Sequence, residues 1–118
     1  MYIVYGIKNC NTVKKALDYL NEHHVPYQFH DYKKEGITKK KFSEWATQIG
    51  WEPLINKKGT TWRKLDDSTK NSITNKTNAI NLAVQQTSVI KRPLIELNGS
   101  VIALGFEQAA YDAVTWVH

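Results

Sequence analysis

Cysteine is almost absent from this chain of 118 residues, because Cys10 is the only one. A single cysteine cannot form an internal disulfide, which excludes a disulfide-stapled secreted module and fits a reducing compartment. Long apolar runs are also missing, since no stretch approaches the roughly 20 residues needed to cross a bilayer. The N-terminus shows no basic segment followed by an apolar one and a cleavage site. We therefore expect a cytoplasmic protein that does not contact membranes.

Arginine is scarce as well, although the net charge is +5. Only Arg63 and Arg92 among the 16 basic residues are arginines, and the rest are lysines spread along the chain. The excess of positive charge favours an anionic partner. The lysine run at residues 39–41 is not accompanied by an aromatic-interleaved basic stripe, so we do not expect direct binding of nucleic acid.

Cys10 lies at a predicted junction between a loop and a helix. Residues 2–5 are a β-branched and aromatic run that predicts a buried strand, and Gly6 ends it. A predicted amphipathic helix follows Cys10. Its apolar residues at helical spacing are Val13, Ala16, Leu17 and Leu20.

This junction favours a reactive thiolate. The first N–H groups of a helix lack intrahelical partners and lower the pKa of a cysteine placed there. Nearby cations could also stabilise the anion, and those available are Lys8, Lys14 and Lys15. A small buried hydrophobe is the alternative interpretation of a lone cysteine. The polar neighbours of Cys10 favour the reactive thiol, and they are Asn9, Asn11 and Thr12.

The middle of the chain predicts a second strand followed by a helical insertion. Residues 27–32 alternate as a strand does, and with the first strand and helix they predict a right-handed, parallel βαβ unit. Residues 33–36 are interpreted as a polar break. A helix then begins after Thr38 and stops at Gly50. Beyond it, residues 66–77 are polar and turn-rich, and Asn78 is the predicted cap of one more helix.

The C-terminal part predicts a hairpin and a last helix. Two apolar strands, residues 94–97 and 101–104, flank the Asn98-Gly99-Ser100 turn. From Glu107 onward, apolar residues at helical spacing predict an amphipathic helix, and they are Ala110, Ala113, Val114 and Val117. The predicted fold class is α/β, with the order βαβ, helical insertion, ββα and a mixed four-stranded sheet. We expect one domain over residues 1–118, with the sheet formed by residues 1–32 and 89–118 and the insertion by residues 33–88.

Three segments carry a family resemblance: YGIKNC at residues 5–10, GTTWRKL at residues 59–65 and IKRPL at residues 90–94. They resemble the arsenate reductase (ArsC)-related family, most of all its YffB branch, with the Spx regulators as cousins. The likeness covers essentially the whole chain. It implies a thioredoxin-like fold with an inserted helical subdomain, in agreement with the order of elements.

The resemblance also implies a role for individual residues. Cys10 corresponds to the family's nucleophilic cysteine, and Arg63 and Arg92 correspond to arginines that hold an oxyanion or acidic substrate. Around Cys10, the predicted substrate-binding residues are Lys8, Asn9, Asn11 and Thr12. Pro93 corresponds to the proline that is cis in thioredoxin-like proteins, whereas an X-Pro bond alone predicts trans. Without the motifs, both arginines would be interpreted as solvated or ion-paired surface residues.

Two positions depart from relatives in the family. Phe106 follows Gly105 where the arsenate reductases carry a third arginine, which argues against genuine arsenate reduction. Val13 stands where Spx-type regulators have a second cysteine, so an internal disulfide switch is impossible.

No metal site or bound organic cofactor is expected. The histidines are His23, His24, His30 and His118. Adjacent side chains diverge on a helix, and no cysteine or carboxylate stands at a metal-ligand spacing from them.

The resemblance and the Cys10 junction together predict a glutathione-dependent thiol reductase-like enzyme. The Cys10 thiolate would attack a disulfide or another electrophilic centre of an anionic substrate, and glutathione or another small thiol would act as co-substrate. We expect a monomer. The alternatives are a non-catalytic, Spx-like regulator that binds RNA polymerase, and a weak arsenate reductase.

Overall fold

The computed structural model describes residues 1–118, and the chain divides into two compact units. The sheet unit combines Met1–Glu35 with Arg92–His118, and the helical unit is Gly36–Lys91. The sequence placed the boundaries slightly earlier, because residues 33–35 belong to the sheet unit and residues 89–91 to the helical unit. None of the helices has both the length and the apolar character that spanning a membrane requires.

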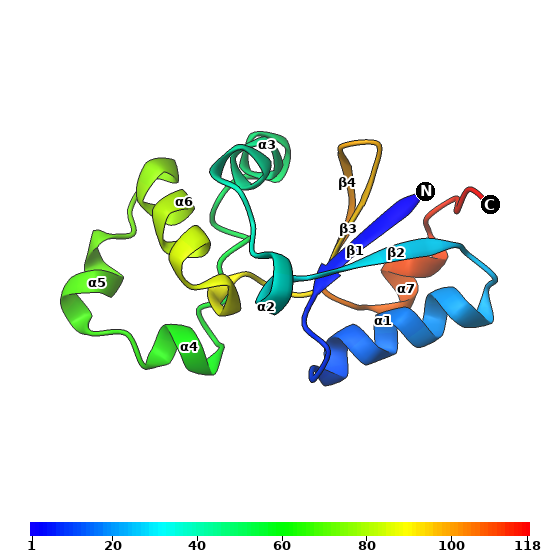
Figure 1. Ribbon diagram of the computed structural model, residues 1–118, viewed down its shortest axis with the longest axis horizontal. Helices are drawn as coiled ribbons and strands as arrows, with labels where there is room; N and C mark the ends of the chain where they lie inside the picture. Colours follow the sequence, from blue (N-terminus) through cyan, green and yellow to red (C-terminus); the bar gives the residue numbers. More distant parts are fainter. The chain divides into compact units, whose positions relative to one another are not determined.

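The sheet unit contains the predicted mixed four-stranded sheet (Figure 1). Its strands are β1 (Tyr2–Gly6), β2 (Tyr27–Asp31), β3 (Leu94–Leu97) and β4 (Ser100–Leu104), in the spatial order β2-β1-β3-β4. Strands β1 and β2 are parallel, whereas β3 pairs with both β1 and β4 in the antiparallel sense. The α/β fold class and the βαβ and ββα halves are thus confirmed.

One face of this sheet is covered by α1 (Asn11–Glu22) and α7 (Gln108–Asp112) (Figure 1). The shared core is fully or almost fully buried and consists of Tyr2, Val4, Ala16, Tyr19, Leu20, Val25, Ile95 and Tyr111. Helical spacing correctly predicted Ala16 and Leu20, because every third or fourth side chain of a helix faces the same way. Leu17 is only partly buried against this core, and the buried Tyr19 was not predicted.

Gly6 allows α1 to approach the end of β1 closely. A Cβ atom at this position would lie 2.9 Å from Cγ2 and 3.3 Å from Cγ1 of Val13, closer than real side-chain contacts allow. Val13 is buried in the first turn of α1. The contact between these two residues therefore fixes the start of the helix, and with it the connector that carries Cys10.

The last helix differs from its prediction. It is only five residues long, and Ala110, Ala113 and Val117 are exposed rather than buried. Tyr111 fills the space instead, and its hydroxyl donates to the carbonyl oxygen of Gly105 at 2.7 Å. Trp116 donates through Nε1 to the carbonyl oxygen of Tyr111 at 2.9 Å. Aromatic packing, which helical periodicity does not register, thus holds the C-terminal segment.

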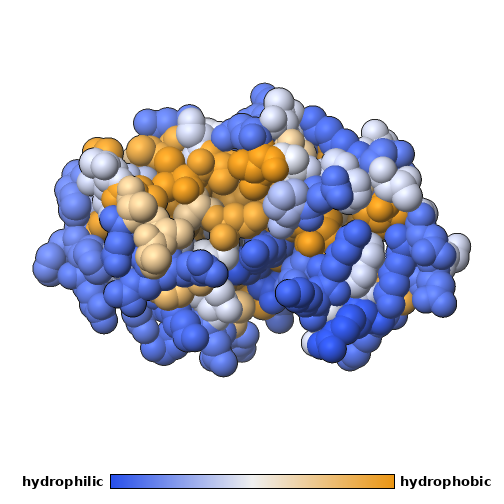
Figure 2. All heavy atoms as spheres, turned by 180° about the vertical axis from the view of Figure 1, so that it is seen from behind, coloured by the Kyte–Doolittle hydropathy of each residue, from blue (hydrophilic) through white to orange (hydrophobic).

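Strand β4 lies at the edge of the sheet and is only half-buried from Val101 to Leu104. Figure 2 shows apolar side chains gathered over part of one face of the molecule, next to wide hydrophilic areas. The Asn98–Gly99 turn before β4 has positive φ at both residues, 51° and 86°. This turn confirms the predicted hairpin.

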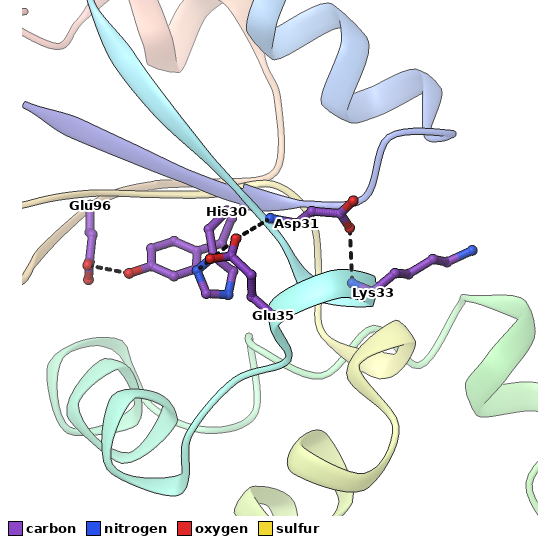
Figure 3. Close-up of polar contacts among 6 residues, drawn as sticks. His30, Asp31, Lys33, Glu35 and Glu96 are labelled. Carbon is purple, nitrogen blue, oxygen red and sulfur yellow. Dashed lines mark hydrogen bonds and ion pairs between the residues drawn. The ribbon is translucent and has the colours of Figure 1, made fainter.

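Strand β2 ends one residue earlier than predicted, and the predicted polar break is the short helix α2 (Tyr32–Glu35). The Asp31 side chain accepts from the backbone N–H of Lys33 at 3.0 Å, and Glu35 Oε2 accepts from the N–H of Asp31 at 3.3 Å (Figure 3). These two hydrogen bonds cap the turn from both sides, as in a capping box. They turn the chain immediately after β2.

The helical unit contains α3 (Lys39–Ile49), α4 (Thr60–Arg63), α5 (Asp67–Ser72), α6 (Lys76–Gln85) and the 3-10 turn η1 (Thr87–Val89). Helix α3 is confirmed as predicted, because Thr38 Oγ1 accepts from the N–H of Lys41 at 3.1 Å and Gly50 ends the helix at φ 88°. Phe42 and Trp45 are completely buried in this unit.

Two predictions for the helical unit were wrong. Residues 66–77 are not only turns, because Asp66 accepts from the N–H of Thr69 at 2.6 Å and starts α5. Helix α6 is capped by Asn75 rather than Asn78, since Asn75 Oδ1 accepts from the Asn78 N–H at 2.9 Å. The Asn78 side chain donates to the carbonyl oxygen of Ser72 at 2.6 Å. Several capping residues stand close together here, and only the tertiary contacts decide among them.

Candidate active site

The candidate site lies at the end of the sheet where strands β1 and β2 finish, which we call the Cys10 edge. The register pairs Gly6 with Asp31, so the parallel strands β1 and β2 end together. Tyr5 pairs with Leu94, so β3 begins at the same edge. The connector to Cys10, the start of α2 and the Arg92–Pro93 segment therefore meet at this edge. Ligands of open α/β sheets commonly bind beyond the carboxyl ends of parallel strands.

Cys10 is the N-cap residue of α1, as the sequence predicted. Its backbone is extended, with φ −140° and ψ 119°, and its carbonyl oxygen accepts from the N–H of Lys14 at 2.9 Å. The side chain is a free thiol of intermediate exposure. The sulfur is thus held by the first turn of the helix and is still partly open to solvent.

The surroundings of Cys10 favour its thiolate. Burial raises the pKa of the thiol, but hydrogen bonds from the Val13 amide and the Arg92 side chain, the positive charge of Arg92 and the Thr12 amide together lower the pKa below its usual value. The sulfur makes no conventional cap hydrogen bond. We attribute the lowering to the weaker contacts of the amides and guanidinium that face it, since sulfur is a large and weak acceptor.

The cation beside the sulfur is Arg92 rather than a lysine. The sequence made Lys8, Lys14 and Lys15 available to the thiolate, but Lys14 Nζ bonds to Asp18 Oδ2 at 2.8 Å, one turn further along α1. Lys8 and Lys15 are exposed. Lys14 and Asp18 are four residues apart and therefore adjacent on the helix surface. Helical spacing carries no information about an arginine far along the chain, so it could not predict Arg92 beside Cys10.

Arg92 and Pro93 lead into β3. Their peptide bond is cis, as the resemblance implies. Pro93 is buried, and its carbonyl oxygen accepts from the N–H of Gly105 at 2.7 Å, which ties the segment to the end of β4. Arg92 is half-buried. A partly desolvated guanidinium interacts more strongly with a thiolate than a fully hydrated lysine would.

The other predicted substrate-binding residues are placed differently. Lys8, Asn9, Asn11 and Thr12 surround Cys10 in the chain and are exposed. Arg63 belongs to the helical unit, where it is exposed at the end of α4 and its carbonyl oxygen accepts from Lys70 Nζ at 3.0 Å. The structure therefore brings Arg92 to Cys10, with Pro93 next to Arg92 in the chain, and a role for Arg63 stays a prediction.

Phe106 is part of an aromatic cluster next to this edge. Its ring lies edge-on to Tyr111 and Tyr19, with ring centroids 4.7 Å and 6.1 Å apart. The side chain is half-buried and offers no hydrogen-bond donor. Phe106 consequently supports the packing of the last helix at a position where the arsenate reductases are expected to have an arginine.

Sequence reasoning missed a buried polar cluster near the same edge. The Tyr5 hydroxyl donates to Glu96 Oε1 at 2.6 Å, and both residues are almost fully buried (Figure 3). Tyr32 is 2% exposed, its hydroxyl makes no hydrogen bond, and its ring centroid lies 6.2 Å from that of Tyr5. The signal in the sequence was the single carboxylate of the otherwise apolar strand Leu94–Leu97.

The histidines do not come together. The His30 ring packs at a tilt against that of Tyr5 with ring centroids 4.6 Å apart, and its Nδ1 lies 3.8 Å from Glu35 Oε2 (Figure 3). His23 stacks on Tyr19 at 3.9 Å, and His118 Nε2 lies 3.0 Å from the carbonyl oxygen of His23. No group of three or more His, Cys, Asp or Glu side chains is arranged to hold a metal ion.

Known proteins resemble this chain over almost its whole length. A model of the ArsC family matches residues 5–114. An uncharacterised protein of Haemophilus influenzae is 43% identical over 113 residues, which cover 96% of this chain and 97% of that protein. The solved structure of a protein named YFFB (PA3664) is 45% identical, with a TM-score of 0.89 and coverage of 96% and 97%. An ArsC-related protein from Brucella melitensis is 40% identical, with a TM-score of 0.76 and coverage of 95% and 92%. The chain therefore belongs to the ArsC family.

Proposed function

We propose that this protein is a thiol reductase-like enzyme that uses Cys10 as its single nucleophile and glutathione as its co-substrate. The observation that carries the proposal is the thiolate site itself, in which the amides of α1 and the Arg92 guanidinium lower the pKa of a partly exposed cysteine. A thiolate rather than a thiol attacks disulfides, so a lowered pKa increases the reactive fraction at neutral pH. Membership of the ArsC family, whose name refers to arsenate reductase, supports a thiol-dependent reductase role.

The proposed reaction is thiol–disulfide exchange. The Cys10 thiolate attacks one sulfur of a substrate disulfide, a new S–S bond forms, and the other sulfur leaves as a thiolate that takes a proton from solvent. A glutathione thiolate then attacks the mixed disulfide and releases Cys10. A second glutathione completes the reduction, so that two glutathione molecules are oxidised to one disulfide and the substrate disulfide becomes two thiols.

Arginine would provide recognition of the anionic substrate. Arg92 is beside the sulfur and can pair with a carboxylate of glutathione through its planar fork. Further donors near the thiolate are the exposed side-chain amides of Asn9 and Asn11, the hydroxyl of Thr12 and the ammonium of Lys8. Arg63, exposed on the helical unit, is proposed as a second arginine for the same substrate.

Arsenate is proposed to be a poor substrate. An oxyanion needs a closely spaced set of donors, and Phe106 packs among aromatic rings instead of supplying one. Each missing charge-assisted hydrogen bond costs about 1.5–3 kcal/mol. Glutathione carries its charges farther from the sulfur and does not depend on that donor.

Intact mass after treatment with oxidised glutathione tests the proposal. We expect one glutathionyl group on each chain, removable by a reducing thiol, and none on the Cys10→Ser variant. Failure of the folded protein to form this adduct would overturn the glutathione assignment. An inert Cys10 in a protein that forms a stable complex with RNA polymerase would instead support the Spx-like regulator.

A further inference from the structure

The candidate site contains a buried carboxylate that the proposed reaction does not use. Glu96 is 2% exposed on β3, and the Tyr5 hydroxyl donates to its Oε1 at 2.6 Å (Figure 3). Burying a carboxylate is strongly unfavourable unless it is hydrogen-bonded and faces a positive charge. A sheet that only needed packing at this position would be served better by an apolar residue.

The titratable groups near Glu96 come from several elements at this edge. Tyr5 is on β1, the His30 ring packs at a tilt against Tyr5 from β2, and Tyr32 begins α2. Arg92 precedes β3. The cation among them that also faces Cys10 is Arg92.

Strand pairing brings Arg92 and Glu96 toward the same residue, because the Tyr5 hydroxyl donates to Glu96 and Tyr5 pairs with Leu94, two residues after Arg92. The electrostatics of Tyr32 agree with this placement. Burial first, and then the charges of Tyr5 and Glu96, raise the pKa of Tyr32, while the charge of Arg92 opposes them. Both charges therefore lie near the same buried hydroxyl. Arg92 therefore has two acidic groups in its surroundings, the Cys10 thiol and the Glu96 carboxyl.

We propose that Glu96 is a positioning residue: held by the Tyr5 hydroxyl, its buried carboxylate is the counter-charge that keeps the Arg92 guanidinium directed at Cys10. This inference rests on the proposed function, because it explains how the thiolate keeps its cation while Cys10 exchanges partners. Once Cys10 forms a neutral mixed disulfide, the thiolate no longer attracts Arg92. Glu96 then holds the guanidinium in place for the carboxylate of the bound substrate and for the returning thiolate.

The direction of the Cys10 pKa shift on neutralising Glu96 distinguishes positioning of Arg92 from a direct electrostatic effect of Glu96 on Cys10. The negative charge of Glu96 by itself disfavours a nearby thiolate, so neutralising it without moving Arg92 would lower the Cys10 pKa. If Glu96 holds Arg92, neutralising it lets the guanidinium move away, and the Cys10 pKa rises. The Glu96→Gln variant keeps the size and an acceptor for Tyr5 but removes the charge.

The experiment follows iodoacetamide alkylation of Cys10 against pH in the folded full chain. For Glu96→Gln we expect the inflection to move upward, with alkylation about three- to tenfold slower below the inflection. Glu35→Gln is the matched control, because it removes the same charge from an exposed carboxylate of the same unit that faces His30. Its profile should match that of the wild type.

The outcomes are distinguishable from those that test the reductase proposal. A wild-type inflection at the value of an ordinary thiol would contradict the thiolate site, whatever Glu96 does. A lowered wild-type inflection that stays the same or falls further in Glu96→Gln would overturn the positioning role alone. Tyr5→Phe provides a second variant if Glu96→Gln does not fold, because it removes only the hydroxyl that holds Glu96. A smaller upward shift is expected there, and an unchanged profile would also overturn the inference.

Discussion

The sheet unit and the helical unit use their polar side chains in different ways. In the sheet unit, Cys10 and Arg92 are partly buried and interact, and Tyr5 and Glu96 are buried and joined by a hydrogen bond. In the helical unit, the polar side chains of Thr38, Asp66 and Asn75 are exposed and start helices. We therefore propose that the sheet unit carries the chemistry, whereas the polar residues of the helical unit specify local structure.

The two arginines illustrate this difference. Arg92 is half-buried and lowers the pKa of Cys10, whereas Arg63 is exposed on a short helix. A partly desolvated charge acts through a lower effective dielectric than an exposed one. We therefore expect Arg92 to tune the nucleophile and Arg63 to contribute to substrate binding alone.

The largest expected effect is that of removing the thiol. Cys10→Ser should reduce glutathione-dependent disulfide reduction by at least about a thousandfold, because no other residue can form the mixed disulfide. The melting temperature should not fall, since serine is a preferred N-cap residue. Thr38→Ser makes a conservative change at an N-cap of the helical unit and should leave turnover unchanged. Comparable loss in both variants would remove the distinction between the units.

Arg92→Lys comes next in size. Lysine keeps the charge but loses the bidentate fork, so kcat/KM for a glutathione-containing disulfide should fall roughly ten- to hundredfold, and the Cys10 pKa should rise. Arg63→Lys is the matched variant in the helical unit and should raise KM while leaving the alkylation profile of Cys10 unchanged. Equal kinetic constants for the wild type and Arg92→Lys would exclude Arg92 from the site.

Phe106→Arg tests whether position 106 serves aromatic packing in this protein and could serve anion binding with an arginine. The free energy of unfolding should fall by about 1–3 kcal/mol, because the ring leaves the cluster with Tyr19 and Tyr111. Arsenate turnover should rise, up to about tenfold, if the new guanidinium reaches the oxyanion. Phe106→Leu loses the same ring without adding a donor, so it should be destabilised with no gain in turnover. A gain in Phe106→Leu would refute the donor explanation.

The smallest effect is expected in the helical unit. Asn75→Ala removes the side-chain acceptor for the Asn78 N–H and should lower the free energy of unfolding by about 1 kcal/mol. Chemical denaturation measures this change, and Cys10 alkylation should not respond. Asn81→Ala, in the exposed part of α6, provides the control and should be neutral or slightly stabilising. A change in Cys10 reactivity in Asn75→Ala would show that the helical unit influences the thiolate.

Local patterns predicted most of the sheet unit. A β-branched and aromatic run identified β1, and alternation identified β2. The Asn98–Gly99 turn identified the hairpin, and helical spacing identified α1 with Cys10 at its start. These features depend on residues close together in the sequence. Helix α5 and the cap of α6 were missed because several polar residues there could start a helix. Tyr111 was missed because its role depends on ring contacts with distant residues.

The candidate site also has a part that local sequence predicted and a part that depends on the tertiary fold. The position of Cys10 at the start of α1 could be predicted because the helix terminus is adjacent in sequence. The cation beside Cys10 could not be predicted from the sequence, since Lys14 pairs with Asp18 and the guanidinium of Arg92 takes that place. The Tyr5–Glu96 hydrogen bond joins residues that are 91 positions apart, and only strand pairing brings them together. Residue types predict chemistry, but the tertiary fold decides which charges share a space.

The pH dependence of Cys10 alkylation in the wild-type protein tests the thiolate site most directly. The helix amides and Arg92 lower the pKa in the folded state, so below the usual thiol pKa the folded protein should react faster than the same protein unfolded in urea. The unfolded chain binds more protons in the interval between the two pKa values, so folding stability should rise with pH across that interval and be lost as pH falls through the folded pKa. We expect a folded-state inflection clearly below that of the unfolded chain. Coincident inflections for the folded and unfolded protein would contradict a thiolate stabilised by α1 and Arg92.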